Sequence, residues 1–366
     1  MKSVSITIII SLIFLLTGCW DQSLLVNKTF INGISFDLTE DGKILSSVRT
    51  LSIQNKGGGQ FEVKDEVIQA SRQNISGLSV DINKSVPGQI DASKAYVILI
   101  GEELAKKGIH PILEAFYRNK NAYVSSKVVI VEGKGSDILS LNPETSPIAF
   151  VILKGLQAAE KSTEISNESV FTAWPQIVDP GKDIVLPYVT TDNKNKLIIA
   201  GVKLFNGDKY TGISLSEEKS SLLLLLMNRL DKFSQMAIDL DKNRTVLFKT
   251  ANVNRDLKLK VNKSTRKITG KLDLKLNIDV LNYSNKPGVK INIEKLNNEL
   301  ASELTKQLEF VTNSLLKANC DALGIGRILS SSYPEIWKKI DWEKEYKNVQ
   351  FDIKVKVNIE KTGSVF

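Results

Sequence analysis

The sequence predicts a mixed α/β and α+β protein of three domains, each a β-sheet with flanking helices. Three observations predict this class: a strand, helix, strand order in the first half, a turn-linked pair of apolar runs near residue 206, and long alternating strands around an amphipathic helix after residue 257. At 366 residues the chain exceeds the usual range of roughly 100 to 200 residues for one domain. We expect a signal peptide at 1–18 and domains at 19–190, 191–250 and 251–366.

The N-terminus has the features of an export signal. Lys2 precedes an apolar run at 4–16, which is shorter than the roughly 18 to 20 residues that cross a bilayer. Residues 16–19 (Leu-Thr-Gly-Cys) resemble a bacterial lipobox. Cleavage before Cys19 would leave this residue with an S-linked diacylglycerol and an N-acyl chain, and more than one chain gives durable attachment. An uncleaved N-terminal anchor helix is the alternative, and both interpretations place the protein at a membrane.

Cysteine content and charge restrict the remaining chemistry. The chain has two cysteines, so lipidation of Cys19 leaves Cys320 without an intrachain disulfide partner. Cys320 has apolar neighbours, and we expect a buried small hydrophobe. The formal net charge is +8, but the charges are interspersed. Lysines on solvent faces of strands account for most of the surplus, with attraction to an anionic membrane as a second use. A nucleic acid partner is not expected.

The first domain is expected to begin with a hairpin of strands at 30–36 and 44–53 around the turn Asp41-Gly42. Three glycines within 56–60 indicate a loop, and a helix is expected around 63–75. A strand at 96–100, a helix at 102–118 and a strand at 128–131 predict a crossover unit. A helix near 147–161 follows, and the proline-containing segment 171–189 is predicted to be rich in loops.

The rest of the chain contains clearer periodicities. Residues 197–205 and 210–215 flank Asn-Gly-Asp at 206–208, which predicts a hairpin. Five leucines at 222–226 indicate a buried helix, with a partner-binding or membrane-contacting helix as the alternative. Period-two runs at 257–261 and 268–280 predict two antiparallel strands, an apolar stripe at 296–315 predicts a long helix over that sheet, and 349–360 predicts a last strand.

Candidate catalytic residues are few. His110 is the single histidine, so a serine or cysteine nucleophile would depend on it, and the usual zinc sites are excluded by counting. The acidic pairs Glu102-Glu103 and Glu217-Glu218 lie at expected helix starts, where they favour the helix dipole. Gly324-Ile325-Gly326 is a lone GxG and is interpreted as a turn. We therefore expect no enzyme activity, metal or cofactor, and no catalytic residue is assigned.

Three tryptophans, Trp174, Trp337 and Trp342, are candidate anchors of an interface, because aromatic residues are enriched in binding hot spots. Burial against the core is the competing interpretation. An exposed apolar patch beside a tryptophan would favour the interface, and full burial would exclude it.

Several separated segments resemble one family. They are 18–21 (Gly-Cys-Trp-Asp), 31–37 (Ile-Asn-Gly-Ile-Ser-Phe-Asp), 200–209, 321–326 (Asp-Ala-Leu-Gly-Ile-Gly), 333–337 (Tyr-Pro-Glu-Ile-Trp), Trp342 and the last strand. In this order they resemble the C subunits of bacterial spore germinant receptors, over nearly the whole mature chain. One departure is that residues 22–25 lack the acidic residue expected just after the Trp-Asp pair.

The resemblance implies a lipoprotein on the outer face of the spore inner membrane. It implies integral membrane A and B subunits as partners in a complex that responds to nutrients such as amino acids or sugars, and three α/β-type domains. Cys19 is the site residue that it carries over, and direct nutrient binding by this subunit stays open. The alternatives are a solute-binding lipoprotein of a transporter, which usually has two similar lobes, and an envelope enzyme that uses carboxylates.

Overall fold

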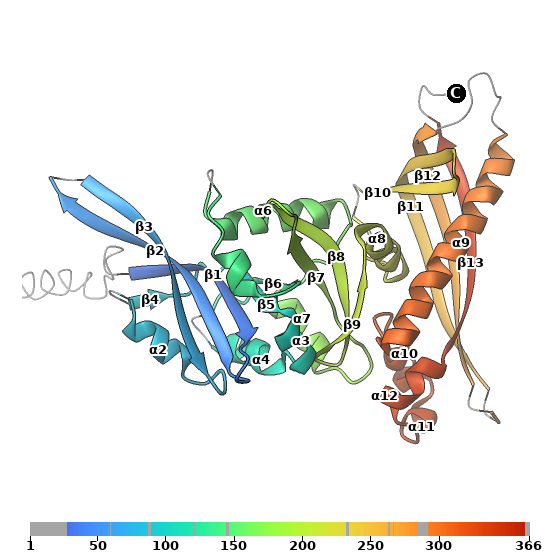
Figure 1. The fold of residues 1–366 in the computed structure, drawn as a ribbon. Helices are drawn as coiled ribbons and strands as arrows, with labels where there is room; N and C mark the ends of the chain where they lie inside the picture. The colour runs from blue at the N-terminus through green and yellow to red at the C-terminus, as the bar shows by residue number, and fades with distance from the viewer. Residues whose placement is uncertain are drawn as a thin grey trace, which may run out of the picture.

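The structure is a computed structural model that describes residues 28–362, except 59, 87–88, 120–121, 144–145, 232–233, 263, 266 and 284–291. The described strands form two sheets. The first has the order β3-β2-β1-β5-β6-β7-β8-β9, with β4 beside β1, and the second has the order β10-β11-β12-β13. The two sheets lie in separate halves of an elongated molecule, with α8 between them (Figure 1).

The fold begins with the predicted hairpin, formed by β1 (Lys28–Leu38) and β2 (Ile44–Gly57). Its turn contains Gly42, whose φ of 80° suits glycine. The loop predicted at 56–60 is the tight turn between β2 and β3 (Gln60–Arg72), where Gly57 and Gly58 have positive φ values. The prediction of a helix at 63–75 is wrong, because β3 pairs with β2 along its whole length. Hydrogen bonding to β2 satisfies this backbone, and tertiary pairing of this kind overrides helix propensity.

Parallel strands continue the sheet beyond β1, with β4 (Gln89–Asp91), β5 (Val97–Gly101), β6 (Lys127–Val131) and β7 (Val185–Thr191). Both faces are covered, as the predicted crossover requires. In Figure 1, α6 (Ile148–Lys161) lies above the sheet, and α2 (Leu78–Lys84) and α4 (His110–Arg118) lie below it. The single helix predicted at 102–118 is divided into α3 (Glu102–Lys107) and α4 by Gly108, at φ 131°. A short helix, α5 (Gly135–Leu139), precedes α6.

The segment predicted to be rich in loops contains regular structure, so that prediction is largely wrong. Helix α7 (Val170–Ile177) begins with a capping box, in which Ser169 N donates to Thr172 Oγ1 (2.9 Å) and Thr172 N donates to Ser169 Oγ (3.4 Å). Burial of Val170 and Ala173 against the sheet holds this helix despite Pro175. Residues 178–184 lie outside helices and strands, and β7 begins at Val185.

The predicted second hairpin is confirmed as β8 (Leu197–Asn206) and β9 (Lys209–Leu215), which extend the first sheet because β8 pairs with β7. The predicted buried helix is α8 (Glu217–Leu226), whose five leucines are all buried. The count of three domains is not confirmed, since the described strands fall into two sheets. The boundaries at 190 and 250 stay predictions.

In the second sheet, β10 (Gln235–Asp241), β11 (Arg244–Val261) and β12 (Ile268–Tyr283) are antiparallel. The last strand, β13 (Gln350–Lys361), runs parallel to β12, so the sheet predicted as antiparallel is mixed. The reason is that α9 (Ile293–Ala318) forms a crossover connection between these two strands. Its predicted apolar stripe is buried: Leu296, Leu300, Leu304, Leu308, Val311 and Leu315.

Three short helices follow α9: α10 (Ile325–Ser332), α11 (Pro334–Trp337) and α12 (Trp342–Glu345), with a 3-10 turn, η2 (Tyr346–Asn348), before β13. None of the helices in the described ranges combines the length and the apolar character that a bilayer crossing needs.

Candidate functional site

The residues predicted to carry chemistry are scattered. Cys19 and the signal peptide at 1–18 lie outside the described residues. His110 opens α4, where its ring lies 5.0 Å from that of Trp174 and its Nδ1 lies 4.0 Å from Glu114 Oε2. Cys320 is fully buried, as predicted, and burial raises the pKa of its thiol. Within the described ranges, no three or more His, Cys, Asp or Glu residues are grouped to hold a metal ion.

Buried polar groups gather instead where the two halves meet. We call this region the joint, defined by segments 179–183 and 206–208 of the first half and segment 319–327 of the second. Asp183 N donates to Asp321 O (3.0 Å), and Asp321 N donates back to Asp183 Oδ2 (2.7 Å). Asp183 Oδ1 accepts a third bond from Gly207 N (2.7 Å). Asn206 Nδ2 adds a bond to Asn319 O (2.6 Å).

Asp321 organises the second half's side of the joint. Its Oδ1 accepts from Ile325 N (2.8 Å), and its Oδ2 accepts from Gly326 N (2.7 Å) and Trp342 Nε1 (3.1 Å). The carboxylate therefore satisfies the first free N–H groups of α10, as a capping group does. Burial raises the pKa of Asp321 to about 7 and that of Asp183 to about 6, although these N–H donors lower both.

Two glycines let the backbones touch at the joint. A Cβ on Gly326 would lie 2.5 Å from Trp342 Nε1 and 2.9 Å from Gly181 Cα. A Cβ on Gly181 would lie 2.7 Å from Arg327 N, which donates to Gly181 O (2.9 Å). The motif at 321–326 thus has a physical role: its aspartate caps α10, and its last glycine permits the close contact.

Charged groups surround the joint. Asp179 pairs with Arg327 across it. Lys182 lies beside Gly324, and burial, reinforced by Arg229 and Arg327, lowers its pKa to about 8. The Asp179–Arg327 pair therefore adds an electrostatic link between the two halves to the hydrogen bonds of the joint.

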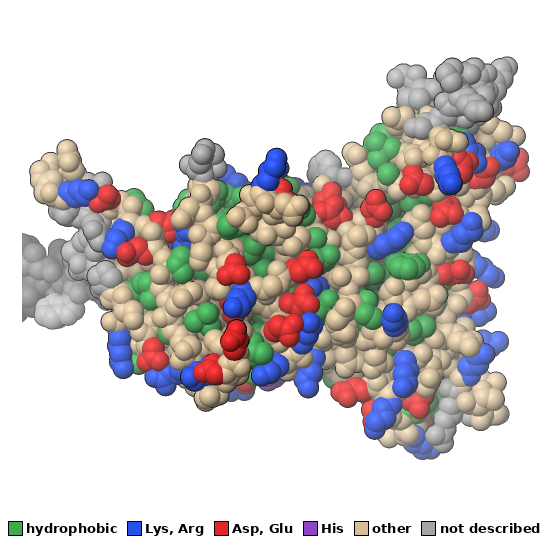
Figure 2. Space-filling model, in the orientation of Figure 1, with side chains coloured by type: hydrophobic (Ala, Val, Ile, Leu, Met, Phe, Trp, Pro, Cys, Tyr) green, Lys and Arg blue, Asp and Glu red, His purple; other side chains and the backbone are tan. Residues whose placement is uncertain are grey.

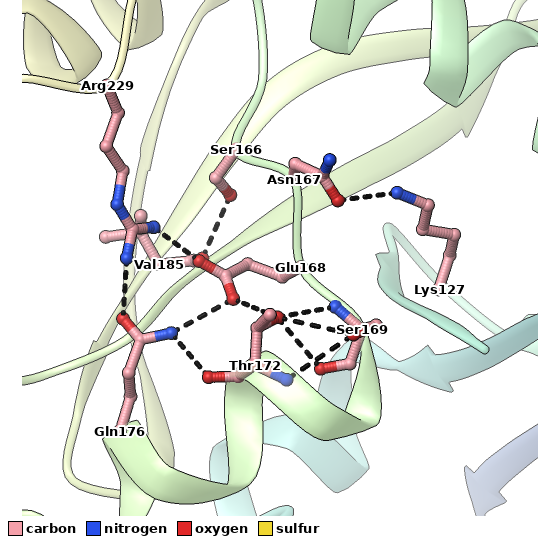
Figure 3. Close-up of polar contacts among 9 residues, drawn as sticks. All are labelled: Lys127, Ser166, Asn167, Glu168, Ser169, Thr172, Gln176, Val185 and Arg229. Carbon is pink, nitrogen blue, oxygen red and sulfur yellow. Dashed lines mark hydrogen bonds and ion pairs between the residues drawn. The ribbon is translucent and has the colours of Figure 1, made fainter. Parts of the chain in front are cut away.

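A second buried carboxylate, that of Glu168, lies close enough to the joint to interact electrostatically with Lys182, and Figure 3 shows its polar contacts. Glu168 is 1% exposed and accepts bonds from Thr172 Oγ1 (2.7 Å), Gln176 Nε2 (3.0 Å) and Arg229 Nη1 (2.6 Å). Arg229 belongs to the segment that leads from α8 to β10. The cluster therefore attaches this connection to α7 in the first half.

A partly buried ion pair lies within the first half. Lys203 Nζ lies 2.6 Å from Glu102 Oε2, and it lies over the rings of Tyr188 (4.8 Å) and Tyr210 (4.4 Å). Glu102 was predicted as part of a helix start, but its pairing with Lys203 was not predicted from the sequence. A lone lysine inside the apolar run 201–205 was the available signal. Asp183 gave a similar signal, because it is a charged residue directly beside the apolar run 184–186.

The tryptophans differ in environment. Trp342 is buried and bonded to Asp321, which excludes it as an interface anchor. Trp337 is half-buried against the core, and Trp174 is half-buried at the surface of α7. Together these sites position backbone and helices.

Comparisons with known proteins agree with the fold. Residues 21–191 match the spore germination protein N-terminal domain, and residues 200–363 match the spore germination B3/GerAC-like C-terminal domain. The chain is 21% identical over 349 residues to spore germination protein GerQC of Bacillus cereus, covering 95% of this chain and 96% of the relative. It is 23% identical to spore germination protein KC of Bacillus subtilis (strain 168), covering 96% and 93% of the two chains.

Among solved structures, the crystal structure of the GerBC protein superposes with a TM-score of 0.59 at 17% identity. The superposition covers 93% of this chain and 100% of that one. This structural similarity supports the predicted mixed α/β and α+β class. It is evidence about the fold and not about the function.

Proposed function

Because this chain belongs to the germinant receptor C subunit family, we propose that it is the lipid-anchored, non-enzymatic C subunit of a nutrient germinant receptor complex. It is held through acylated Cys19 on the outer face of the spore inner membrane, beside integral membrane A and B subunits. Its work is to assemble with these subunits, and germination in response to a nutrient requires it.

The observation that carries this proposal is the continuity of the family match. Two spore germination domains match in order from residue 21 to residue 363, and the alignment with GerQC spans nearly both chains. The lipobox-like residues 16–19 directly precede the first match. In addition, the buried acids of the described chain are bonded to backbone N–H groups and helices, which favours a scaffold over an envelope enzyme.

A solute-binding lipoprotein of a transporter is less well supported. Such proteins usually bind their ligand in a cleft between two similar lobes. Here one half has a nine-stranded sheet and the other a four-stranded sheet, and Gly181 meets Gly326 directly where the halves join.

Spores that carry Cys19→Ala test the proposal. They would be scored for germination with a panel of nutrients, for the protein's membrane fraction, and for its co-purification with membrane subunits. Cys320→Ala is the matched control, because it removes the other, buried cysteine and leaves the anchor. We expect Cys19→Ala alone to lose membrane attachment and the response to one nutrient. Normal germination with every nutrient, combined with impaired uptake of one solute, would support the transporter alternative instead.

A further inference from the structure

Helix α7 has an apolar outer face as well as an apolar inner one. Val170 and Ala173 are buried against the sheet. On the opposite side, Phe171 is 60% exposed and Val178, the C-cap, is 52% exposed. Trp174 and Pro175 complete this outer stripe at helical spacing. The stripe contains no charged residue, and neither does the rest of α7.

The stripe continues onto α4. The ring of Tyr117, 40% exposed, stacks on Trp174 with a centroid distance of 5.5 Å and an interplanar angle of 22°. We call Tyr117, Phe171, Trp174, Pro175 and Val178 the aromatic patch. Large apolar side chains that stay exposed together in this way mark an interaction surface more often than scattered single ones do.

The patch belongs to one helical layer. Buried residues of α2, α3, α4 and α7 share one core on the same face of the first sheet, so the outer sides of these helices face the same way. Val80 on α2 adds another exposed apolar side chain, at 51%. Lys84 and Lys107 on this layer are exposed. Figure 2 shows basic side chains, with acidic ones among them, along the lower border of this half, over α2, α3 and α4.

The chain enters the fold beside this layer. Lys28 starts β1 and pairs with Asp91 of β4 (2.9 Å), the strand that follows α2. Lys28 lies nine positions after Cys19 in the sequence, and a chain of that length spans at most about 32 Å. A lipid at Cys19 would therefore keep the layer close to the bilayer, where even a weak contact is highly populated.

We propose that the aromatic patch rests on the surface of the bilayer that holds the anchor, with its rings at the boundary between headgroups and acyl chains. Aromatic side chains concentrate at this depth, and the uncharged α7 reaches it without desolvating a charge. Lysines on the same layer would lie toward anionic headgroups. The proposal rests on the lipid anchor at Cys19, and it adds the orientation of the protein on the membrane.

The test uses the full-length lipidated protein, with Trp20→Phe to remove the tryptophan next to the anchor. It is reconstituted in vesicles of phosphatidylcholine and phosphatidylglycerol whose acyl chains carry bromine, a quencher of tryptophan fluorescence. We expect part of the fluorescence to be quenched. Trp174→Phe should remove the quenched component, whereas Trp337→Phe, the matched control, should leave it. Phe171→Ser with Val178→Ser should weaken quenching without unfolding the protein, as circular dichroism would verify.

Flotation of the vesicles tests the lipid anchor separately from the proposed orientation. Protein that does not float would overturn the anchor and this orientation with it. Protein that floats with Trp174 unquenched would overturn the orientation alone. A third outcome would also overturn the bilayer proposal. If the lipid bromine does not quench Trp174, and if adding the integral membrane subunits protects Trp174 from quenching by aqueous iodide, the patch is a protein interface.

Discussion

Asp183 and Asp321 exchange two hydrogen bonds across the joint, although one belongs to the nine-stranded sheet's half and the other to the four-stranded sheet's half. Asp321 is buried and Asp183 is half-buried, and backbone N–H groups supply most of the hydrogen bonds to the two carboxyls. A buried carboxylate is costly unless such donors surround it. The relative position of the halves therefore depends on a few residues in the two contacting segments.

Asp321→Asn should lower the free energy of unfolding by about 2–3 kcal/mol. The amide oxygen can replace one carboxylate oxygen, but the amide nitrogen would then face the donors of Gly326 or Trp342. Asp352→Asn, an exposed position on β13, should change the value by less than about 0.5 kcal/mol. Urea unfolding followed by circular dichroism measures both variants. Equal stability of the two would contradict the assigned role of Asp321.

The same pair predicts a pH dependence. In the folded chain the pKa values of Asp183 and Asp321 are about 6 and about 7, against an ordinary 3.8, so the fold holds protons that the unfolded chain releases. The stability that these two carboxyls contribute is fully present when the pH is below their ordinary pKa of 3.8. It is lost as the pH rises through 6 and 7. Each carboxyl contributes at most about 1.4 kcal/mol per pH unit.

Unfolding of the wild type and Asp321→Asn at about pH 5 and about pH 8 checks the sign. The wild type should lose more stability than the variant over this interval. Parallel curves for the two proteins would show that Asp321 does not titrate there.

Gly326→Ala should destabilise the protein by at least about 2 kcal/mol, because the new Cβ would overlap Trp342 and Gly181. Gly155→Ala on α6 is the control. Its Cβ would meet the tip of the Ile199 side chain at 3.0 Å, which can move, and alanine favours the helix by about 1 kcal/mol. Thermal unfolding should therefore show a lower midpoint for the first variant and little change for the second.

Elements with a strong local period were predictable from the sequence. The positions of apolar residues indicate the buried face of each of three elements: the helix at 296–315 and the strands at 268–280 and 349–360. The structure confirms these elements. The strand β3 was not predictable from the sequence, because its acidic residues suit a helix equally well. Pairing with β2 makes this segment a strand, and local sequence does not indicate which strands pair.

The joint shows the same limit. Asp321 was noticed within a resembling motif, but its partner Asp183 lies far away in sequence. Hydrogen bonds between such distant residues arise only when the two halves meet. Sequence spacing could not indicate that Glu168, Lys182 and Arg229 would gather beside them.

Arg229→Met should lower the free energy of unfolding by about 2–3 kcal/mol, since Glu168 would stay buried without its cation. The side chain of Arg229 is 35% exposed, which keeps the cost below that of a fully buried pair. Adding Glu168→Gln should restore part of the loss, because the uncompensated charge is then removed. Arg118→Met, whose side chain is 76% exposed, should cost less than about 0.5 kcal/mol. A double-mutant cycle by urea unfolding would reveal the coupling, and strictly additive effects would argue against it.

Leu223→Ala tests whether α8 joins the two halves through its buried face. Leu223 is fully buried in a core that also contains residues of α6, α9 and the second sheet. The substitution should cost about 2–5 kcal/mol, whereas Leu281→Ala, at a side chain 40% exposed, should cost far less. Because α8 packs on both β8 and α9, we also expect the variant to unfold over a broader range, as the halves become less coupled. Unchanged stability together with lost binding of the membrane subunits would instead support a partner-binding helix.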